Sequence, residues 1–132
     1  MNVYFVNKYR LNNNLPPFEV SGDRWVRSND IPGGVLKEYF KGPGSTEKYY
    51  YGWTAIYDGF TGYSKLEITN GIARLYLAGA CEPVNLDYTI ADILTYNLKQ
   101  FPDINYVKIY EQNGLTKDPF GISYSIPMCL EP

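Results

Sequence analysis

Apolar residues recur at every second position in several short stretches, which is typical of β-strands with one buried face. Residues 3–6, Val-Tyr-Phe-Val, predict a first strand near the N-terminus. Residues 19–27 predict a second short strand or an irregular edge, with Trp25 buried. Residues 105–111 predict a late strand, because Val107 and Ile109 fall on one face.

A hairpin is the strongest local prediction. Two β-prone runs, residues 65–69 and 72–77, flank Asn70-Gly71. Asn-Gly between such runs favours a type I′ turn, because both central residues need positive φ. In the second run, one face carries Ala73, Leu75 and Leu77.

Two stretches have the helical period. The first follows Asn29 and Asp30, which can cap a helix, and ends at Gly42-Pro43, since proline cannot continue a helix. The second covers residues 89–101 and ends at Pro102. There, Thr89 and Asp92 resemble a capping box, and the apolar residues form one stripe.

The order of these elements is β-α-β-β-α-β. The strands on either side of the second helix should be parallel, with a right-handed crossover. The pattern therefore predicts an α+β fold with a single domain, in which one mixed β-sheet carries two helices on one face. We expect residues 1–118 to form this domain and residues 119–132 to form a C-terminal tail.

Aromatic residues are concentrated in the segment 44–63, which has little periodicity. Three interpretations stand: a cover for the sheet or a loop core, a protein-binding surface, and a platform that stacks sugars. The residues assigned to an interaction surface in this segment are Tyr49, Tyr50, Tyr51, Trp53, Tyr57 and Tyr63. The outward face of the sheet adds Arg74, Tyr76, Tyr106, Lys108 and Tyr110.

The chain has 14 tyrosines and no histidine. Histidine is the commonest general base at neutral pH and the commonest metal ligand. Its absence excludes Ser-His-Asp and Cys-His nucleophiles and a His-based zinc site. Four carboxylates remain as candidates for a catalytic pair, and Asp58 also as a calcium ligand: Asp58, Glu67, Asp87 and Asp92. Because no pair has a defined separation, we expect no enzymatic activity, no metal and no cofactor.

Charge excludes further classes of partner. The 12 Lys and Arg and the 14 Asp and Glu give a net charge of −2 and are interspersed. No basic run suits a nucleic acid, so we expect no nucleic-acid partner. No apolar stretch has the length of a membrane span.

Two cysteines, Cys81 and Cys129, match neither a metal-binding nor a redox spacing. Paired, they would close a loop of about 50 residues and tether the Pro-flanked tail, which favours a disulfide and an oxidising compartment. Two free thiols are the alternative.

Three blocks of the chain resemble the GerMN domain, the sporulation and spore germination domain. The first is the helix that ends in residues 36–43, with Gly-Pro at its end. The second is the turn and strand of residues 70–77. The third is the helix, the Phe-Pro break and the strand of residues 93–109, extended by Asn113-Gly114. The blocks span most of residues 3–114.

The resemblance implies a bacterial, extracytoplasmic and often lipid-anchored module without known enzymatic chemistry. We therefore expect a non-enzymatic protein-interaction or structural domain of the cell envelope, which binds a protein partner or its own copies. The alternative is a glycan- or peptidoglycan-binding module with an aromatic surface, for which cell-wall glycan is the partner. A signal or anchor would lie outside this sequence, and the membrane would be reached only through it.

Overall fold

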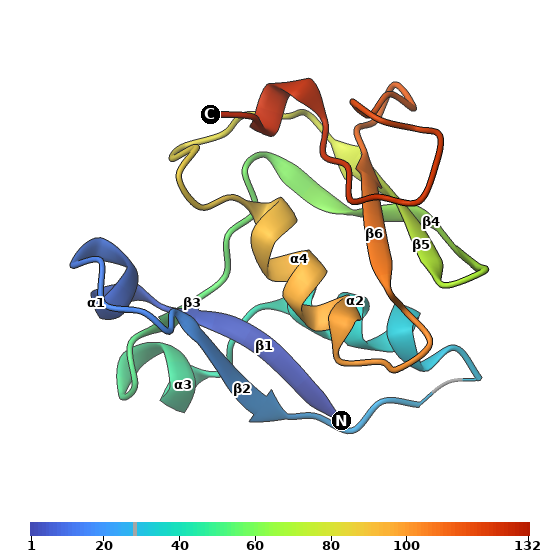
Figure 1. Cartoon of the computed structure of the whole chain (residues 1–132). Helices are drawn as coiled ribbons and strands as arrows, with labels where there is room; N and C mark the ends of the chain where they lie inside the picture. The colour runs from blue at the N-terminus through green and yellow to red at the C-terminus, as the bar shows by residue number, and fades with distance from the viewer. Residues whose placement is uncertain (28) are drawn as a thin grey trace. The chain divides into compact units, whose positions relative to one another are not determined.

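The structure, a computed structural model, describes residues 1–27 and 29–132. The chain divides into two compact units, Met1–Ile56 and Tyr57–Pro132, called here the N-terminal and the C-terminal unit. Each unit has its own three-stranded sheet and its own helices (Figure 1).

The sheet of the N-terminal unit has the order β2-β1-β3. Its strands are β1 (Asn2–Asn7), β2 (Glu19–Asp23) and β3 (Trp53–Thr54), and both pairings are antiparallel. The predicted strand at residues 3–6 is therefore confirmed, as the centre of this sheet. The helix α1 (Lys8–Asn12) follows β1 directly, and the Asn7 side chain caps it by accepting the Arg10 N–H at 3.0 Å.

The predicted helix after Asp30 is α2 (Ile31–Lys41), which packs against β1. The Asp30 carboxylate accepts the Gly33 N–H at 3.1 Å, and the helix ends at Gly42, whose φ is 86°. Val35, Leu36 and Tyr39 are buried. A short helix, α3 (Ser45–Tyr49), follows.

The Tyr39 side chain connects this helix to the rest of its unit. Its ring stacks on Phe5 of β1 at 5.6 Å between centroids. Its hydroxyl donates to the Ile56 carbonyl at 2.9 Å and lies 2.7 Å from the Ile56 N–H, which donates to it. A buried tyrosine thus has its polar end satisfied.

Trp25, predicted to be buried, is 80% exposed, so this prediction is wrong. The strand β2 ends at Asp23, and side chains of extended backbone point to alternate sides. Arg24 turns inward and places its guanidinium 5.5 Å from the centroid of the Phe5 ring. Trp25 then points to solvent, where the Arg27 guanidinium lies 5.6 Å from its ring.

The sheet of the C-terminal unit has the order β4-β5-β6 and is mixed. Its strands are β4 (Phe60–Thr69), β5 (Ile72–Gly79) and β6 (Tyr106–Tyr110). The predicted hairpin is confirmed: β4 and β5 are antiparallel, and the turn residues Asn70 and Gly71 have φ of 53° and 78°. The predicted parallel pairing of β5 and β6 is also confirmed.

The crossover between β5 and β6 contains α4 (Ile90–Lys99), which packs against β6. The predicted capping box is present, since Thr89 Oγ1 accepts the Ala91 N–H and the Asp92 carboxylate accepts the Thr89 N–H. The apolar stripe of the helix is buried. A 3-10 turn, η1 (Met128–Leu130), lies near the C-terminus.

The α+β class is confirmed, and the main elements β1, α2, β4, β5, α4 and β6 follow the predicted order. The strands nevertheless form two sheets, where the sequence predicts one. The reason is that β1 has β2 and β3 as ladder partners on its two edges, so neither edge is left to pair with β4, β5 or β6. Within the described residues, no helix has the length and apolar character needed to cross a membrane.

Candidate interaction surfaces

Three consecutive tyrosines at the end of α3 are the most exposed of the predicted site residues. Tyr49, Tyr50 and Tyr51 are 79%, 86% and 60% exposed, and we call them the tyrosine turn. The rings of Tyr50 and Tyr51 meet edge to face at 6.4 Å between centroids. Lys48 lies 5.5 Å from the centroid of the Tyr49 ring. The turn therefore presents aromatic surface to solvent next to a cation.

Glu47 holds the short helix that carries the tyrosine turn. Its carboxylate accepts the Gly44 N–H at 2.8 Å, which caps the first turn of α3. The same carboxylate forms a two-pronged ion pair with Arg24, whose Nη1 donates to Glu47 Oε2 at 2.9 Å and whose Nη2 donates to Oε1. Both side chains are mostly buried, so the pair ties α3 to the end of β2.

The Arg24 guanidinium, chiefly by its hydrogen bonds, lowers the pKa of Glu47 below its ordinary value of 4.5. A carboxyl group with a lowered folded-state pKa stabilises the fold above its unfolded-state pKa, and this stability is lost as the pH falls through the folded-state pKa. We expect Glu47→Gln to lower the stability of the N-terminal unit by about 1 kcal/mol at pH 7. The difference in stability between the variant and the wild type should shrink as the pH falls below 4.5. Thermal melts of both proteins at pH 7 and below pH 4.5 will measure this difference.

Glu67→Gln is the matched control for this variant. Glu67 pairs with Lys65 at 2.7 Å on an exposed strand, and exposed pairs contribute little. The Glu67→Gln variant should have nearly the melting temperature of the wild type, both at pH 7 and below pH 4.5. Equal effects of the two variants would contradict a special role for the Arg24–Glu47 pair.

The other three predicted aromatic residues of this segment are partly covered. Trp53, on β3, contacts Phe5 at 6.4 Å and Tyr51 at 5.9 Å between ring centroids. Tyr57 is half-buried, and burial raises the pKa of its hydroxyl. Tyr63, on β4, is half-buried opposite Leu77 of β5. Through its contact with the Tyr51 ring, Trp53 thus connects the tyrosine turn to the sheet of the N-terminal unit.

The outward face of the C-terminal sheet carries the remaining predicted residues in two rows. One row pairs Lys65, Tyr76 and Tyr110 across the three strands, and the Tyr76 and Tyr110 rings stack at 4.3 Å. The next row pairs Glu67, Arg74 and Lys108. Tyr106 lies at the start of β6, edge to face with Tyr124 at 5.1 Å.

An open sheet face is expected from the sequence, and this expectation is wrong at β6. Lys108 has no exposed surface, and Tyr110 is 5% exposed. The Lys108 ammonium donates to the carbonyls of Asp118 at 2.7 Å and Phe120 at 3.5 Å, and to Ser123 Oγ at 3.0 Å. Burial lowers the pKa of Lys108, Arg74 lowers it further, and Asp118 opposes the shift. The segment that follows β6 therefore covers this part of the face.

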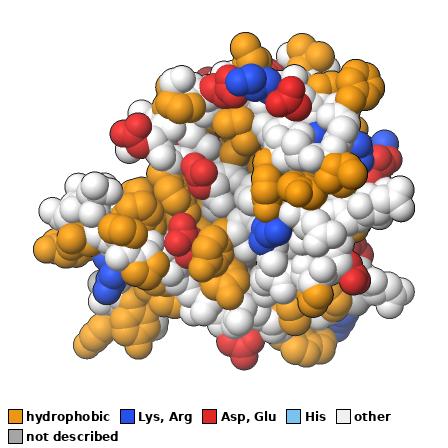
Figure 2. Space-filling view, viewed as in Figure 1, with side chains coloured by type: hydrophobic (Ala, Val, Ile, Leu, Met, Phe, Trp, Pro, Cys, Tyr) orange, Lys and Arg blue, Asp and Glu red, His pale blue; other side chains and the backbone are white. Residues whose placement is uncertain are grey.

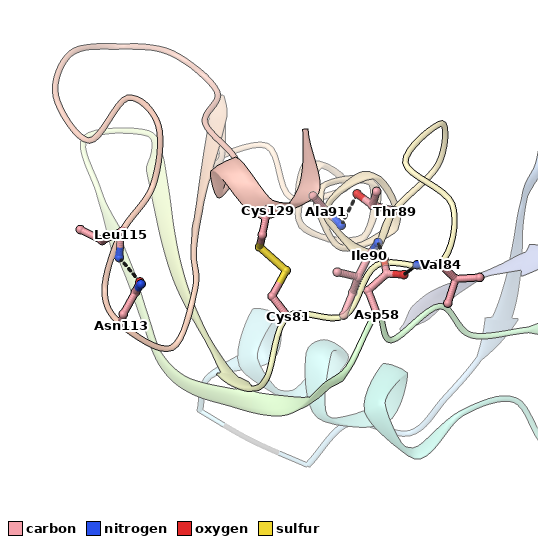
Figure 3. The surroundings of a disulfide bond; sticks show 9 residues. All are labelled: Asp58, Cys81, Val84, Thr89, Ile90, Ala91, Asn113, Leu115 and Cys129. Atoms are coloured by element: carbon pink, nitrogen blue, oxygen red, sulfur yellow. Dashed lines mark hydrogen bonds between the residues drawn. A yellow bond between two sulfur atoms is a disulfide. The ribbon is translucent and has the colours of Figure 1, made fainter. Parts of the chain in front are cut away.

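That segment, residues 111–131, is attached to the unit at several points. Ser125 bridges to β6, with its N–H on the Val107 carbonyl at 3.2 Å and its carbonyl on the Ile109 N–H at 2.9 Å. Lys117 and Glu131 form an ion pair at 2.9 Å. Cys81 and Cys129 form the predicted disulfide, with 6.6 Å between their Cα atoms (Figure 3).

The carboxylate of Asp58, a candidate catalytic or calcium-binding residue, is buried and accepts hydrogen bonds from the backbone. Asp58 is 5% exposed, and its carboxylate accepts the N–H groups of Val84 at 3.2 Å and Ile90 at 2.8 Å (Figure 3). Of the other candidates, Asp92 caps α4, Glu67 pairs with Lys65, and Asp87 is exposed. Among residues 1–27 and 29–132, no three metal-ligating side chains of the His, Cys, Asp and Glu types cluster together.

Sequence reasoning missed a group of exposed apolar side chains in residues 111–131, which we call the C-terminal segment. Phe120 is 88% exposed, Ile122 76% and Tyr124 46%. Figure 2 shows hydrophobic side chains gathered at the top right of the view, where the loop after β6 runs in Figure 1. The only sign of this group in the sequence is that its apolar residues alternate with Gly121 and Ser123. The stretch is too short to predict a strand.

Comparison with known proteins finds no matching family model, no matching curated protein and no matching solved structure.

Proposed function

We propose that this chain is a non-enzymatic interaction domain that binds another protein through the tyrosine turn. The observation that carries the proposal is the exposure of Tyr49, Tyr50 and Tyr51, at 79%, 86% and 60%. Tyrosine combines a large apolar area with a hydroxyl group and loses little conformational entropy when it is immobilised. Interface cores are accordingly enriched in tyrosine.

The way the turn is held supports the same function. The Arg24–Glu47 ion pair and the contact between Tyr51 and Trp53 position its backbone before any partner arrives. A surface that is already ordered has less conformational entropy to lose on binding. The Arg24 and Glu47 side chains near the turn pair with each other, so the turn itself offers aromatic surface and the exposed Lys48.

The cell envelope is the proposed setting. The Cys81–Cys129 disulfide is compatible with an oxidising, extracytoplasmic compartment. The resemblance to the GerMN domain points to the same compartment and to work within a protein assembly.

Photo-crosslinking in the cells that produce the protein tests this function. Benzoylphenylalanine in place of Tyr50 is expected to form a discrete covalent adduct with a partner. The variant Tyr50→Ala/Tyr51→Ala should weaken binding of that partner about tenfold or more. Its melting temperature should stay within about 2 °C of wild type, because exposed side chains contribute little to stability.

Tyr9 offers a matched control, because it is 68% exposed on α1 of the same unit. A crosslinker there should give no adduct, and Tyr9→Ala should leave binding unchanged. A large loss of stability in the double variant would instead make the tyrosines structural. Sedimentation with peptidoglycan that depends on Tyr50 and Tyr51 would favour the glycan-binding alternative.

A further inference from the structure

A pocket in the N-terminal unit lies between the chain that follows β2 and one face of α2. Its volume is about 320 Å³, and residues 25–27 form one wall. The other wall carries helix residues three or four positions apart, a spacing that places side chains on one face of a helix: Gly34, Lys37, Glu38 and Lys41. We call it the Trp25 pocket. It shares no residue with the tyrosine turn.

Trp25 presents an aromatic ring at this pocket. It is 80% exposed, whereas Trp53, the other tryptophan, packs against Phe5. The Arg27 guanidinium lies 5.6 Å from the centroid of the Trp25 ring. An exposed aromatic ring gains binding energy when a ring of a ligand stacks on it. The wall of residues 25–27 therefore suits a ligand that contains a ring.

Positive charge is in excess around the pocket. Glu38 and Lys41 pair with each other at 2.6 Å, so their charges cancel. Lys37 and Arg27 are exposed, and neither has a carboxylate partner among the residues that the structure describes. The chain as a whole has a net charge of −2, so this local excess is opposite in sign to the total. It favours an anionic ligand.

The size of the excess distinguishes between acid groups. A phosphate monoester carries about −1.5 to −2 charges at pH 7, whereas a carboxylate carries a single negative charge. Arginine can donate two parallel N–H bonds to phosphate oxygens, and lysine binds phosphate as a point charge. Arg27 and Lys37 together therefore match a phosphate monoester in charge and in hydrogen-bond donors.

We propose that the Trp25 pocket binds a phosphate monoester attached to a ring, with the ring stacked on Trp25 and the phosphate bonded to Arg27 and Lys37. Nucleoside monophosphates and sugar phosphates both have this chemistry. Small-molecule sites have volumes of about 300–1,000 Å³, and a pocket at the lower end of this range suits one ring and one phosphate. Because both cations are exposed and are screened by salt, a dissociation constant on the order of 0.1–1 mM is expected.

Tryptophan fluorescence of the Trp53→Phe variant tests this proposal, because Trp25 is then the one tryptophan left in the chain. At least one of two probes, uridine monophosphate and glucose-6-phosphate, should change the emission in a saturable way, and the tighter probe identifies the ring. Uridine and inorganic phosphate, the separate halves of the first probe, should each bind about tenfold more weakly or worse. Calorimetry of the wild type should give the same dissociation constants.

Charge and ring variants locate the binding in this pocket. Lys37→Gln should weaken it about fivefold or more, because one of the two unpaired charges is lost. Lys8→Gln is the matched control at an exposed lysine on α1 of the same unit, and it should bind like wild type. Trp25→Ala, measured by calorimetry, should weaken binding about tenfold. Lys37 and Trp25 are exposed, so both variants should melt within about 2 °C of wild type.

Four results would overturn the proposal: no saturable binding of either probe up to about 10 mM, equal affinities of Lys37→Gln and wild type, inorganic phosphate bound as tightly as the probes, or glucuronate, a ring with a carboxylate, bound as tightly as the probes. Sedimentation with phosphatidylglycerol vesicles that depends on Trp25 would also overturn it, in favour of a membrane surface. Tyr50→Ala/Tyr51→Ala should leave this binding unchanged, so the outcome is separate from that for the tyrosine turn.

Discussion

Replacing Cys81 and Cys129 together by serine is expected to lower the stability of the C-terminal unit by about 4 kcal/mol. The disulfide joins residues 48 apart, and such a crosslink removes much of the loop entropy of the unfolded chain. The expected fall in melting temperature is about 16–32 °C for a unit of this size. Calorimetry of the double variant and the oxidised wild type will measure it.

Reduced wild-type protein is the control for this variant, because it loses the same crosslink without any change of sequence. Its melting temperature in reductant should match that of the double variant. The remaining attachments of the C-terminal segment, at Lys108 and Ser125, should persist in both. Two thiols that are freely alkylated in the native oxidised protein, or a melting temperature within about 2 °C of wild type, would contradict the prediction.

Replacing Asp58 by alanine is expected to cost about 3 kcal/mol. The buried carboxylate accepts the N–H groups of Val84 and Ile90, and alanine would leave both donors without this acceptor. Ile90 is the first residue of α4, where a negative charge also interacts favourably with the helix dipole. Asp58 has a φ of 50°, a conformation that alanine adopts at a cost. Urea unfolding of the variant will measure the change.

Asp58→Asn separates the charge from the shape. Asparagine tolerates a positive φ and retains one acceptor oxygen, so about half of the loss is expected. Amide hydrogen exchange at Val84 and Ile90 should accelerate in the alanine variant and less in the asparagine variant. An asparagine variant with the stability and protection of the wild type would show that the charge of Asp58 contributes nothing, and losses equal to those of alanine would show that the retained oxygen contributes nothing.

The elements predicted correctly all carry local signals. The Asn70-Gly71 turn is specified by residues that accept positive φ, and α4 by the capping pair Thr89 and Asp92 and its apolar stripe. The stop of α2 at Gly42 is a property of the backbone at that residue. In each case the interaction partners lie within a few residues of one another, so the pattern along the chain contains the information.

The candidate site was less predictable, because exposure depends on what other segments cover. Tyr50 and Lys108 both appear in the sequence as residues of an aromatic and cationic surface, yet one is 86% exposed and the other fully buried. The difference comes from residues 118–123, whose carbonyls and hydroxyl meet the Lys108 ammonium. A sequence pattern within β6 contains no trace of this cover.

By itself, the sequence determined the α+β class, the order of the main elements, the hairpin and the two capped helices of this protein. It also excluded histidine chemistry, because that exclusion follows from composition alone. Only the tertiary structure decided that the strands form two sheets, that Trp25 is exposed, and that Lys108 anchors the C-terminal segment. The physical reason is range: turns and caps are local, whereas burial is decided by contacts between residues far apart in the chain.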